Sequence, residues 1–191
     1  MKNAIKTILV LLAVFAVIIT LFIINRLTKY VPQNPPDTIG NSAGNLNNGG
    51  YFCEDSDGTV YFANFYDDGT LYAMNADESN IRKISDTKVT SLNTAGNYLY
   101  YYMPDSTAST GLGFVRRVVG IYRSTKKGTS AQTLSRDPAG RLLLCGNTIY
   151  YQTATDATTW NLSAMDTTGK NKTVMHDQSI NPASCHNGII Y

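Results

Sequence analysis

The sequence predicts an all-β fold: about three four-stranded blades of a β-propeller and the start of a fourth, preceded by one transmembrane helix. A glycine followed by an apolar, tyrosine-rich strand occurs four times, with tyrosines at Tyr61, Tyr100, Tyr150 and Tyr191. Their separations of 39, 50 and 41 residues match the repeat length of propeller blades. An apolar run near the N-terminus predicts the helix.

Each repeat holds four strand-sized segments separated by Gly, Asn and Asp turns, the pattern of a β-meander. Apolar and aromatic side chains fall on both faces of the glycine-led strands, which suits sheets packed between neighbouring sheets. A lone blade cannot bury both faces, so the blades must stack. The glycine-led strands are interpreted as the first of each blade, and they are Gly58–Phe62, Gly96–Tyr101 and Gly146–Tyr151. The apolar strands that follow them in the same repeats are Leu71–Asn75, Ile121–Thr125 and Leu162–Asp166.

The middle repeat and the C-terminal repeat are irregular. The middle repeat is longer, and its excess lies between Tyr100 and Tyr122, which predicts a long hairpin loop at one rim. The last repeat stops at Tyr191 inside its first strand, which predicts an edge with nothing to pair. Three blades and a stub do not close a ring. The chain is therefore interpreted as a fragment of a six-bladed propeller or as a half-propeller that closes as a homodimer.

The Gly-Asn-x-Ile-Tyr-Tyr strands, the Leu-Tyr-x-Met-Asn strands and the Asp-led return between repeats resemble a bacterial family of prolow-density-lipoprotein-receptor-like β-propellers with YWTD-like repeats. The resemblance covers residues 50–191 and implies a propeller on an exported surface protein. The family is of unknown function, so no functional residue is carried over. Its turn after the Leu-Tyr strand has a glycine, kept as Gly128 and Gly169; Glu78 replaces it, which predicts strain in a left-handed turn.

The N-terminal run, residues 8–24, is 17 residues long, and only Thr20 in it is polar. As a helix it would span about 25 Å, near the lower limit for crossing a bilayer. A cleaved signal peptide is the alternative, but no small-x-small site follows the run. The predicted organisation is a cytoplasmic segment at 1–7, a transmembrane signal anchor at 8–24, a Pro/Asn/Gly-rich tether at 25–49 and partial propeller repeats at 50–191.

Charge does not orient the helix, because basic residues flank it on both sides. The resemblance to an exported family predicts a single-pass protein of the cell membrane with its C-terminal domain outside. The first 30 residues hold four basic residues and no acids, which leaves 12 Lys and Arg against 14 Asp and Glu in the rest. This balance gives no reason to expect nucleic acid as a partner.

The chain has three cysteines, Cys53, Cys145 and Cys185, and an odd number argues against a disulfide framework. Cys145 and Cys185 both precede a glycine-led strand and could be neighbours. We interpret them as small buried hydrophobes, and the sequence does not fix the redox state of any of the three.

Several motifs match chemical patterns in contexts that favour structural roles. Gly40–Gly44 fits G-x-S-x-G, but a nucleophile elbow needs a strand before it and a helix after it. Gly111–Gly113 is too short for a phosphate cradle. The acidic segments Glu54–Gly58 and Asp67–Gly69 lack the full calcium-loop spacing, so they are predicted to be turns.

The titratable residues give no convergent site. His176 and His186 are the only histidines, and they are predicted to lie on the surface or in loops rather than to bind zinc. A glycosidase needs two carboxylates, and one aspartate recurs in each repeat. Recurrence favours turn capping over catalysis. These aspartates are Asp86, Asp137 and Asp177.

Arg116–Arg117 and Lys126–Lys127 bracket the long hairpin, where they are interpreted as solvated residues rather than as an anion-binding patch. We therefore expect no catalytic, cofactor-binding or metal-binding residue. The predicted function is a membrane-anchored binding module for a protein, a peptide or a cell-wall glycan, contacted through tyrosines at the rim loops or channel mouth. The alternatives are an envelope glycan hydrolase and an envelope sensor whose remaining blades lie outside this chain.

Overall fold

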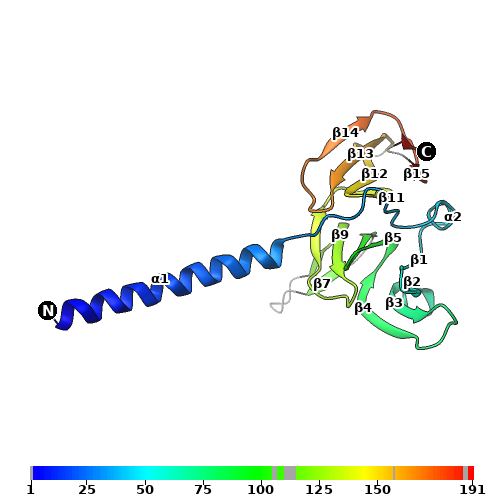
Figure 1. Ribbon diagram of the computed structural model, residues 1–191. Coiled ribbons are helices and arrows are strands. Elements are labelled where there is room, and N and C mark those ends of the chain that lie inside the picture. The colour runs from blue at the N-terminus through cyan, green and yellow to red at the C-terminus, as the bar shows by residue number, and fades with distance from the viewer. Residues whose placement is uncertain (1, 105–106, 110–114, 157, 187–188) are drawn as a thin grey trace. The chain divides into compact units, whose positions relative to one another are not determined.

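A computed structural model describes residues 2–104, 107–109, 115–156, 158–186 and 189–191 (Figure 1). The chain divides into two compact units, Met1–Pro32 and Gln33–Tyr191. The first holds the helix α1 (Lys2–Lys29), and the second, called the β unit below, holds the described strands.

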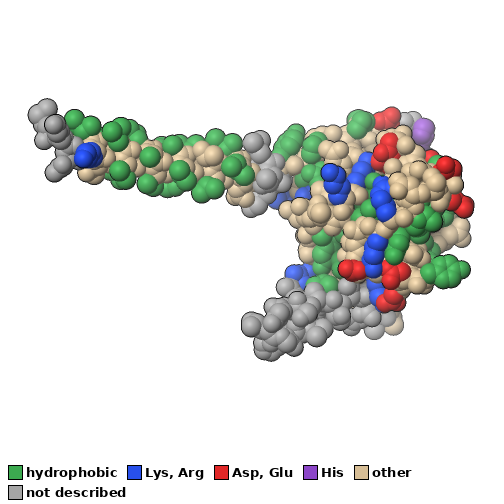
Figure 2. Space-filling view, turned by 90° about the horizontal axis from the view of Figure 1, so that it is seen from below, with side chains coloured by type: hydrophobic (Ala, Val, Ile, Leu, Met, Phe, Trp, Pro, Cys, Tyr) green, Lys and Arg blue, Asp and Glu red, His purple; other side chains and the backbone are tan. Residues whose placement is uncertain are grey.

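Helix α1 is long and apolar enough to cross a membrane. Its candidate span, Ile5–Asn25, has 21 residues and a mean hydropathy of 3.2, so it is longer than the predicted 8–24. At ~1.5 Å per residue it measures ~32 Å, close to the thickness of a bilayer core. Hydrophobic side chains are exposed along the helix (Figure 2). The hydroxyl of Thr20 donates to the carbonyl of Ala16 at 2.9 Å, which satisfies it within the helix.

Three four-stranded antiparallel sheets follow one another along the β unit (Figure 1). Sheet 1 comprises β1 (Phe52–Glu54), β2 (Thr59–Asn64), β3 (Thr70–Asn75) and β4 (Arg82–Lys88). Sheet 2 comprises β5 (Thr90–Ala95), β6 (Tyr98–Met103), β9 (Gly120–Thr125) and β10 (Gln132–Ser135). Sheet 3 comprises β11 (Ala139–Cys145), β12 (Thr148–Ala154), β13 (Trp160–Asp166) and β14 (Thr173–His176). Each sheet keeps its strands in chain order.

The glycine-led strands β2, β6 and β12 are the second strands of their sheets, so the interpretation of them as first strands is wrong. The strand before each one, β1, β5 or β11, pairs with it in antiparallel register. These first strands are also the ones that meet, because β5 contacts both β1 and β11.

Shorter elements complete the β unit. The long insertion forms a hairpin of β7 (Thr107–Ser109) and β8 (Val115–Arg117), as predicted, and Gly111–Gly113 lie outside the described residues. A second small pair joins β15 (Cys185–His186) to β16 (Ile189–Ile190). The strand predicted to end the chain without a partner therefore pairs with β15. The remaining elements are the helix α2 (Ala43–Asn47) and the 3₁₀ turn η1 (Phe65–Asp67).

Sheet 2 is buried on both faces, as its sequence predicts. Successive side chains on a strand point to opposite faces. On β6, Leu99 and Tyr101 belong to the core shared with sheet 1, whereas Tyr100 belongs to the core shared with sheet 3. All three are at most 1% exposed. The tyrosines thus supply packing area between the sheets.

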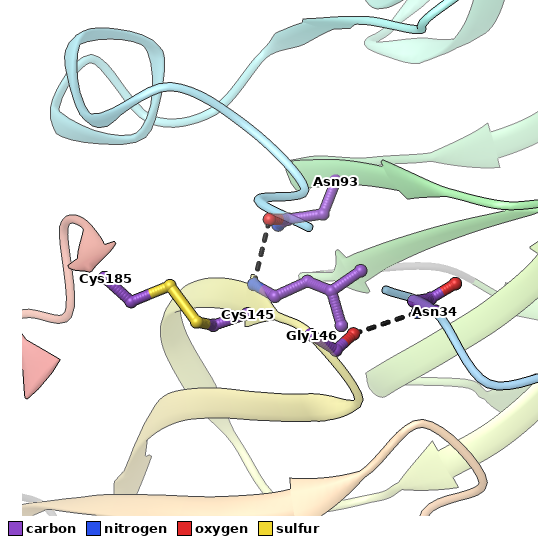
Figure 3. Close-up of a disulfide and its surroundings, with 6 residues drawn as sticks. Asn34, Asn93, Cys145, Gly146 and Cys185 are labelled. Carbon is purple, nitrogen blue, oxygen red and sulfur yellow. Dashed lines mark hydrogen bonds between the residues drawn. A yellow bond between two sulfur atoms is a disulfide. The ribbon is translucent and has the colours of Figure 1, made fainter. Parts of the chain in front are cut away.

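The segment before sheet 1 is part of the β unit, although its composition predicted a tether. Asn34 Nδ2 donates to the carbonyl of Gly146 at 2.9 Å (Figure 3). Asn41 Nδ2 donates to the carbonyl of Leu92 at 2.7 Å, and the Asn41 side chain is buried. The asparagines that suggested a solvated linker instead satisfy backbone carbonyls of distant strands.

A disulfide joins Cys145 at the end of β11 to Cys185 in β15, with their Cα atoms 6.3 Å apart (Figure 3). The interpretation of this pair as two small buried hydrophobes is therefore wrong. The number of cysteines is odd because Cys53 is unpaired. It is a free thiol, buried in the core between sheets 1 and 2. Burial raises the pKa of the Cys53 thiol well above its ordinary value.

The turns after the third strands explain why one repeat has a glutamate where the others have glycine. The residues are left-handed, with φ of 63° at Glu78, 73° at Gly128 and 81° at Gly169. A Cβ on Gly128 would lie 2.5 Å from the carbonyl oxygen of Ile84 in β4 of the preceding sheet. Within the described chain no sheet precedes sheet 1, so Glu78 has room.

We expect Gly128→Ala to lower the free energy of unfolding by about 2 kcal/mol, because alanine is strained at positive φ and its Cβ would overlap the backbone carbonyl of Ile84. Glu78→Gly should raise it by up to about 1 kcal/mol by relieving the same strain. Urea denaturation of the full chain in detergent micelles measures both. Equal stability of Gly128→Ala and the parent chain would contradict the close approach of Gly128 to sheet 1.

Candidate ligand-binding site

A polar pocket of about 340 Å³ lies where sheets 2 and 3 begin. The starts of β5 and β11 form its centre, and the ends of β6 and β12 supply side chains beside them. Helix α2 and the segment that follows it close one side. The lining residues are Leu46, Asn47, Gly49, Tyr51, Thr90, Ser91, Tyr102, Ala139, Gly140, Arg141, Gln152 and Asn181.

Both first strands are irregular where they line this pocket. The pairing of β5 with β6 shifts register between Thr90 and Asn93, and the pairing of β11 with β12 shifts between Ala139 and Leu142. Ser91 within the first irregularity has a left-handed φ of 49°. Bulges redirect side chains and are frequent next to functional sites. Here they place Ser91 and Arg141 in the pocket wall.

Arg141 is held at the pocket by neighbouring amides. Its guanidinium donates to Asn47 Oδ1 at 2.7 Å, and its backbone N–H donates to Gln152 Oε1 at 3.4 Å. Gln152 is itself buried, and its amide donates to the hydroxyl of Ser179 at 3.2 Å. A Cβ on Gly140 would lie 2.7 Å from Gln152 Oε1, so glycine keeps space beside this amide.

The pocket carries a positive charge that no neighbouring carboxylate neutralises. Arg141 is the one Lys, Arg, Asp or Glu side chain among the described residues of the lining, and no described carboxylate lies within 4.0 Å of its guanidinium. A guanidinium can bind a carboxylate through two parallel hydrogen bonds. Tyr51 and Tyr102 add aromatic faces and hydroxyls. The pocket can therefore hold a small polar anion with a flat or ring-shaped body.

The serine of the G-x-S-x-G match has a capping role. Ser42 is the N-cap of α2, and its Oγ accepts a hydrogen bond from the backbone N–H of Asn45 at 3.2 Å. No strand leads into it, and α2 has five residues. The geometry of a nucleophile elbow is absent from this described segment.

The three recurrent aspartates lie in or directly after the last strands of three different sheets. Asp86 pairs with Lys83 at 2.6 Å, Asp137 lies 3.5 Å from the ammonium of Lys172, and Asp177 lies 3.4 Å from Nδ1 of His176. Asp137 also accepts a short hydrogen bond from Ser135. This arrangement offers no pair of carboxylates that flank one cleft.

The histidines lie at the protein surface. His176 and His186 are exposed, and the described residues contain no group of three His, Cys, Asp or Glu side chains that could hold a metal ion. Cys185 is engaged in the disulfide, so it is not a thiolate ligand.

Both acidic segments form turns, as predicted. The Asp57 carboxylate accepts from the backbone N–H of Thr59 at 2.9 Å, and Gly58 has a φ of 80°. In the second turn, hydrogen bonds from Lys83 and then from Thr70 lower the pKa of Asp67 to about 2. The Asp57 carboxylate is thus used within its own turn, and the Asp67 carboxylate joins its turn to Lys83 on β4.

Asp55, inside the first acidic segment, has a role that the sequence did not reveal. Its buried carboxylate pairs with the ammonium of Lys126, 71 residues away, and accepts from Thr94 Oγ1 at 3.3 Å. Lys126 is therefore an internal partner rather than part of a solvated patch. The side chains of Arg116 and Arg117 lie outside the described ones.

The face of the β unit in Figure 2 mixes Lys and Arg with Asp and Glu side chains. This mixture contrasts with the single positive charge of the pocket. Comparison with protein-family models and with curated proteins finds no match to the chain. The residues and their geometry are thus the basis for a functional proposal.

Proposed function

We propose that this protein is a membrane-anchored, extracellular binding module of propeller type that takes a carboxylate-bearing glycan in the Arg141 pocket. The observation that carries the proposal is Arg141 itself: a guanidinium without a described carboxylate partner, in a pocket that two tyrosines also line. Ligand pockets combine aromatic walls with a few placed polar groups in this way. A carboxylate would pair with Arg141, and the sugar rings would contact the tyrosines.

Three features support the propeller assignment. The three sheets share one strand order, they pack face to face, and their first strands lie side by side. Propellers place such first strands around a central axis and bind ligands where that axis opens. The resemblance to the bacterial surface propellers points the same way.

The disulfide supports an extracellular location. Disulfides form and persist in oxidising compartments and are rare in the cytosol. Cys145 and Cys185 are paired in the β unit, and α1 is apolar enough to anchor the chain. The proposed topology therefore has the N-terminus inside and the β unit outside.

A hydrolase would need catalytic carboxylates at the pocket, and the described lining contains no Asp or Glu. The lining groups can bind and orient a ligand, but they include no evident general acid or base beyond the two tyrosines. Binding without turnover is thus the function that the pocket geometry favours.

We expect Arg141→Gln to weaken binding of a glucuronic-acid-containing oligosaccharide about tenfold, the loss of one charge-assisted contact. Calorimetry with the full chain in detergent micelles measures this, and a neutral oligosaccharide of equal length provides the reference. Arg136→Gln is the matched control, because Arg136 is exposed and does not line the pocket. Equal affinity for the charged and neutral sugars, or no effect of Arg141→Gln, would exclude the pocket as the site.

A further inference from the structure

A second hollow, of about 490 Å³, lies on the face of sheet 1 that points away from sheet 2. Its apolar lining comes from β1, β2, β3 and η1, and we call it the sheet 1 groove. Phe52 and Phe65 are 47% and 65% exposed, unusual values for large aromatic side chains. The apolar lining residues are Tyr51, Phe52, Val60, Phe62, Ala63, Phe65, Met74 and Ala76.

The groove corresponds to faces that are buried in the other two sheets. On β2, Val60 and Phe62 flank Tyr61, which packs on sheet 2, so they point to the opposite side. On β6, Leu99 and Tyr101 hold the corresponding positions beside Tyr100, and sheet 1 covers them almost completely. The sheet 1 groove is thus an apolar face that nothing in the described chain covers.

Glu78 is placed where it would prevent another sheet from covering the groove in the same way. In sheets 2 and 3 the corresponding residues are Gly128 and Gly169, and the backbone of the preceding sheet comes within 3.0 Å of where their Cβ atoms would lie. Glu78 has a Cβ and a carboxylate at this point, and it lines the groove. A slimmer partner, such as a single extended segment, avoids that collision.

The charge at the groove selects a basic partner. The chain contains two glutamates, Glu54 and Glu78, and both line the groove. No described Lys or Arg nitrogen lies within 4.0 Å of either carboxylate. The nearby Lys83 is engaged with Asp67 and Asp86. An apolar floor with two unpaired carboxylates is complementary to a peptide that combines apolar side chains with lysine or arginine.

We propose that the sheet 1 groove binds an extended peptide segment of a partner protein in which apolar and basic residues occupy every second position, so that both kinds of side chain point to the groove. The apolar side chains contact Phe52, Phe62 and Met74, and the basic side chains pair with Glu54 and Glu78. Tyr51 lines both this groove and the Arg141 pocket, but the groove does not include Arg141 and takes ligands of opposite charge.

The test uses the full chain in nanodiscs of zwitterionic lipid and two blocked hexapeptides, Leu-Ser-Leu-Ser-Lys-Ser and Leu-Ser-Leu-Ser-Glu-Ser, in which the leucines and the charged residue share one face of an extended chain. Fluorescence anisotropy gives the affinities, with empty nanodiscs subtracted. We expect the lysine peptide to bind at least tenfold more tightly than the glutamate peptide. The double variant Glu54→Lys and Glu78→Lys should reverse this preference. The control is Asp177→Lys, which changes an exposed carboxylate directly after β14 and should leave the preference unchanged.

Three outcomes would overturn the proposal. One is equal binding of the two peptides, and another is a preference that Asp177→Lys alters as much as the double variant does. The third concerns a second copy of this chain as occupant. If the parent chain is a dimer in light scattering and Phe62→Lys in the groove converts it to a monomer, the face serves a second copy rather than a peptide. Arg141→Gln should leave peptide binding unchanged, which separates this site from the proposed glycan pocket.

Discussion

Replacing both Cys145 and Cys185 by serine is expected to lower the free energy of unfolding of the β unit by about 2–4 kcal/mol. The disulfide closes a loop with a sequence separation of 40, so its loss frees a long stretch of the unfolded chain. In the folded state Cys185 is 5% exposed and packs with Leu46 and Leu143. Two serine hydroxyls in this apolar cluster add a desolvation cost.

Urea denaturation of the full chain in detergent micelles measures this loss, and thiol labelling verifies its cause. Without reductant the parent chain should expose one reactive thiol, and only after unfolding, because Cys53 is buried and burial raises its pKa. The control is Cys53→Ala, which leaves the bridge in place. Labelling of three thiols in the unfolded, unreduced parent chain would show that the bridge does not form, and it would remove the support for an oxidising compartment.

The sequence was a good guide to the strands because their signals are local. Gly96 and Gly146 have left-handed φ values of 54° and 56°, so they begin the glycine-led strands at turns where glycine is favoured. The alternation through Leu99, Tyr100 and Tyr101 correctly predicted a sheet buried on both faces. The first strands were harder to place, because β1 has three residues, too few for an alternating pattern to be recognised.

The contacts that define the candidate site could not be predicted, because they join residues that are distant in sequence. Asn47 meets Arg141 across a separation of 94 residues, and nothing around either one marks the other. Arg141 enters the pocket through a register shift in β11, which depends on the pairing partner as much as on the local sequence. Asparagines at 34 and 41 looked like linker residues, since an amide suits both solvent and buried carbonyls.

The largest single-residue effect is expected at the ion pair between sheets 1 and 2. Lys126→Met should lower the free energy of unfolding by about 3 kcal/mol, because it leaves the Asp55 carboxylate buried and unpaired. The carboxylate side chain is 6% exposed, and its remaining described donor is Thr94 Oγ1 at 3.3 Å. Asp55→Asn should cost less, about 1–2 kcal/mol, because the Lys126 side chain is 23% exposed and its ammonium can reach water.

Combining Lys126→Met with Asp55→Asn separates the cost of an unpaired charge from the value of the pair. The double variant holds no buried charge at this position, so it should be more stable than Lys126→Met alone even though it carries one more substitution. Urea denaturation of the four chains gives the coupling energy directly, and Lys127→Met, an exposed neighbour in the same turn, is the matched control. Additive losses in the double variant would mean that Asp55 and Lys126 do not interact, and that the apolar core around Tyr61 and Tyr101 holds sheet 1 against sheet 2 without help from this ion pair.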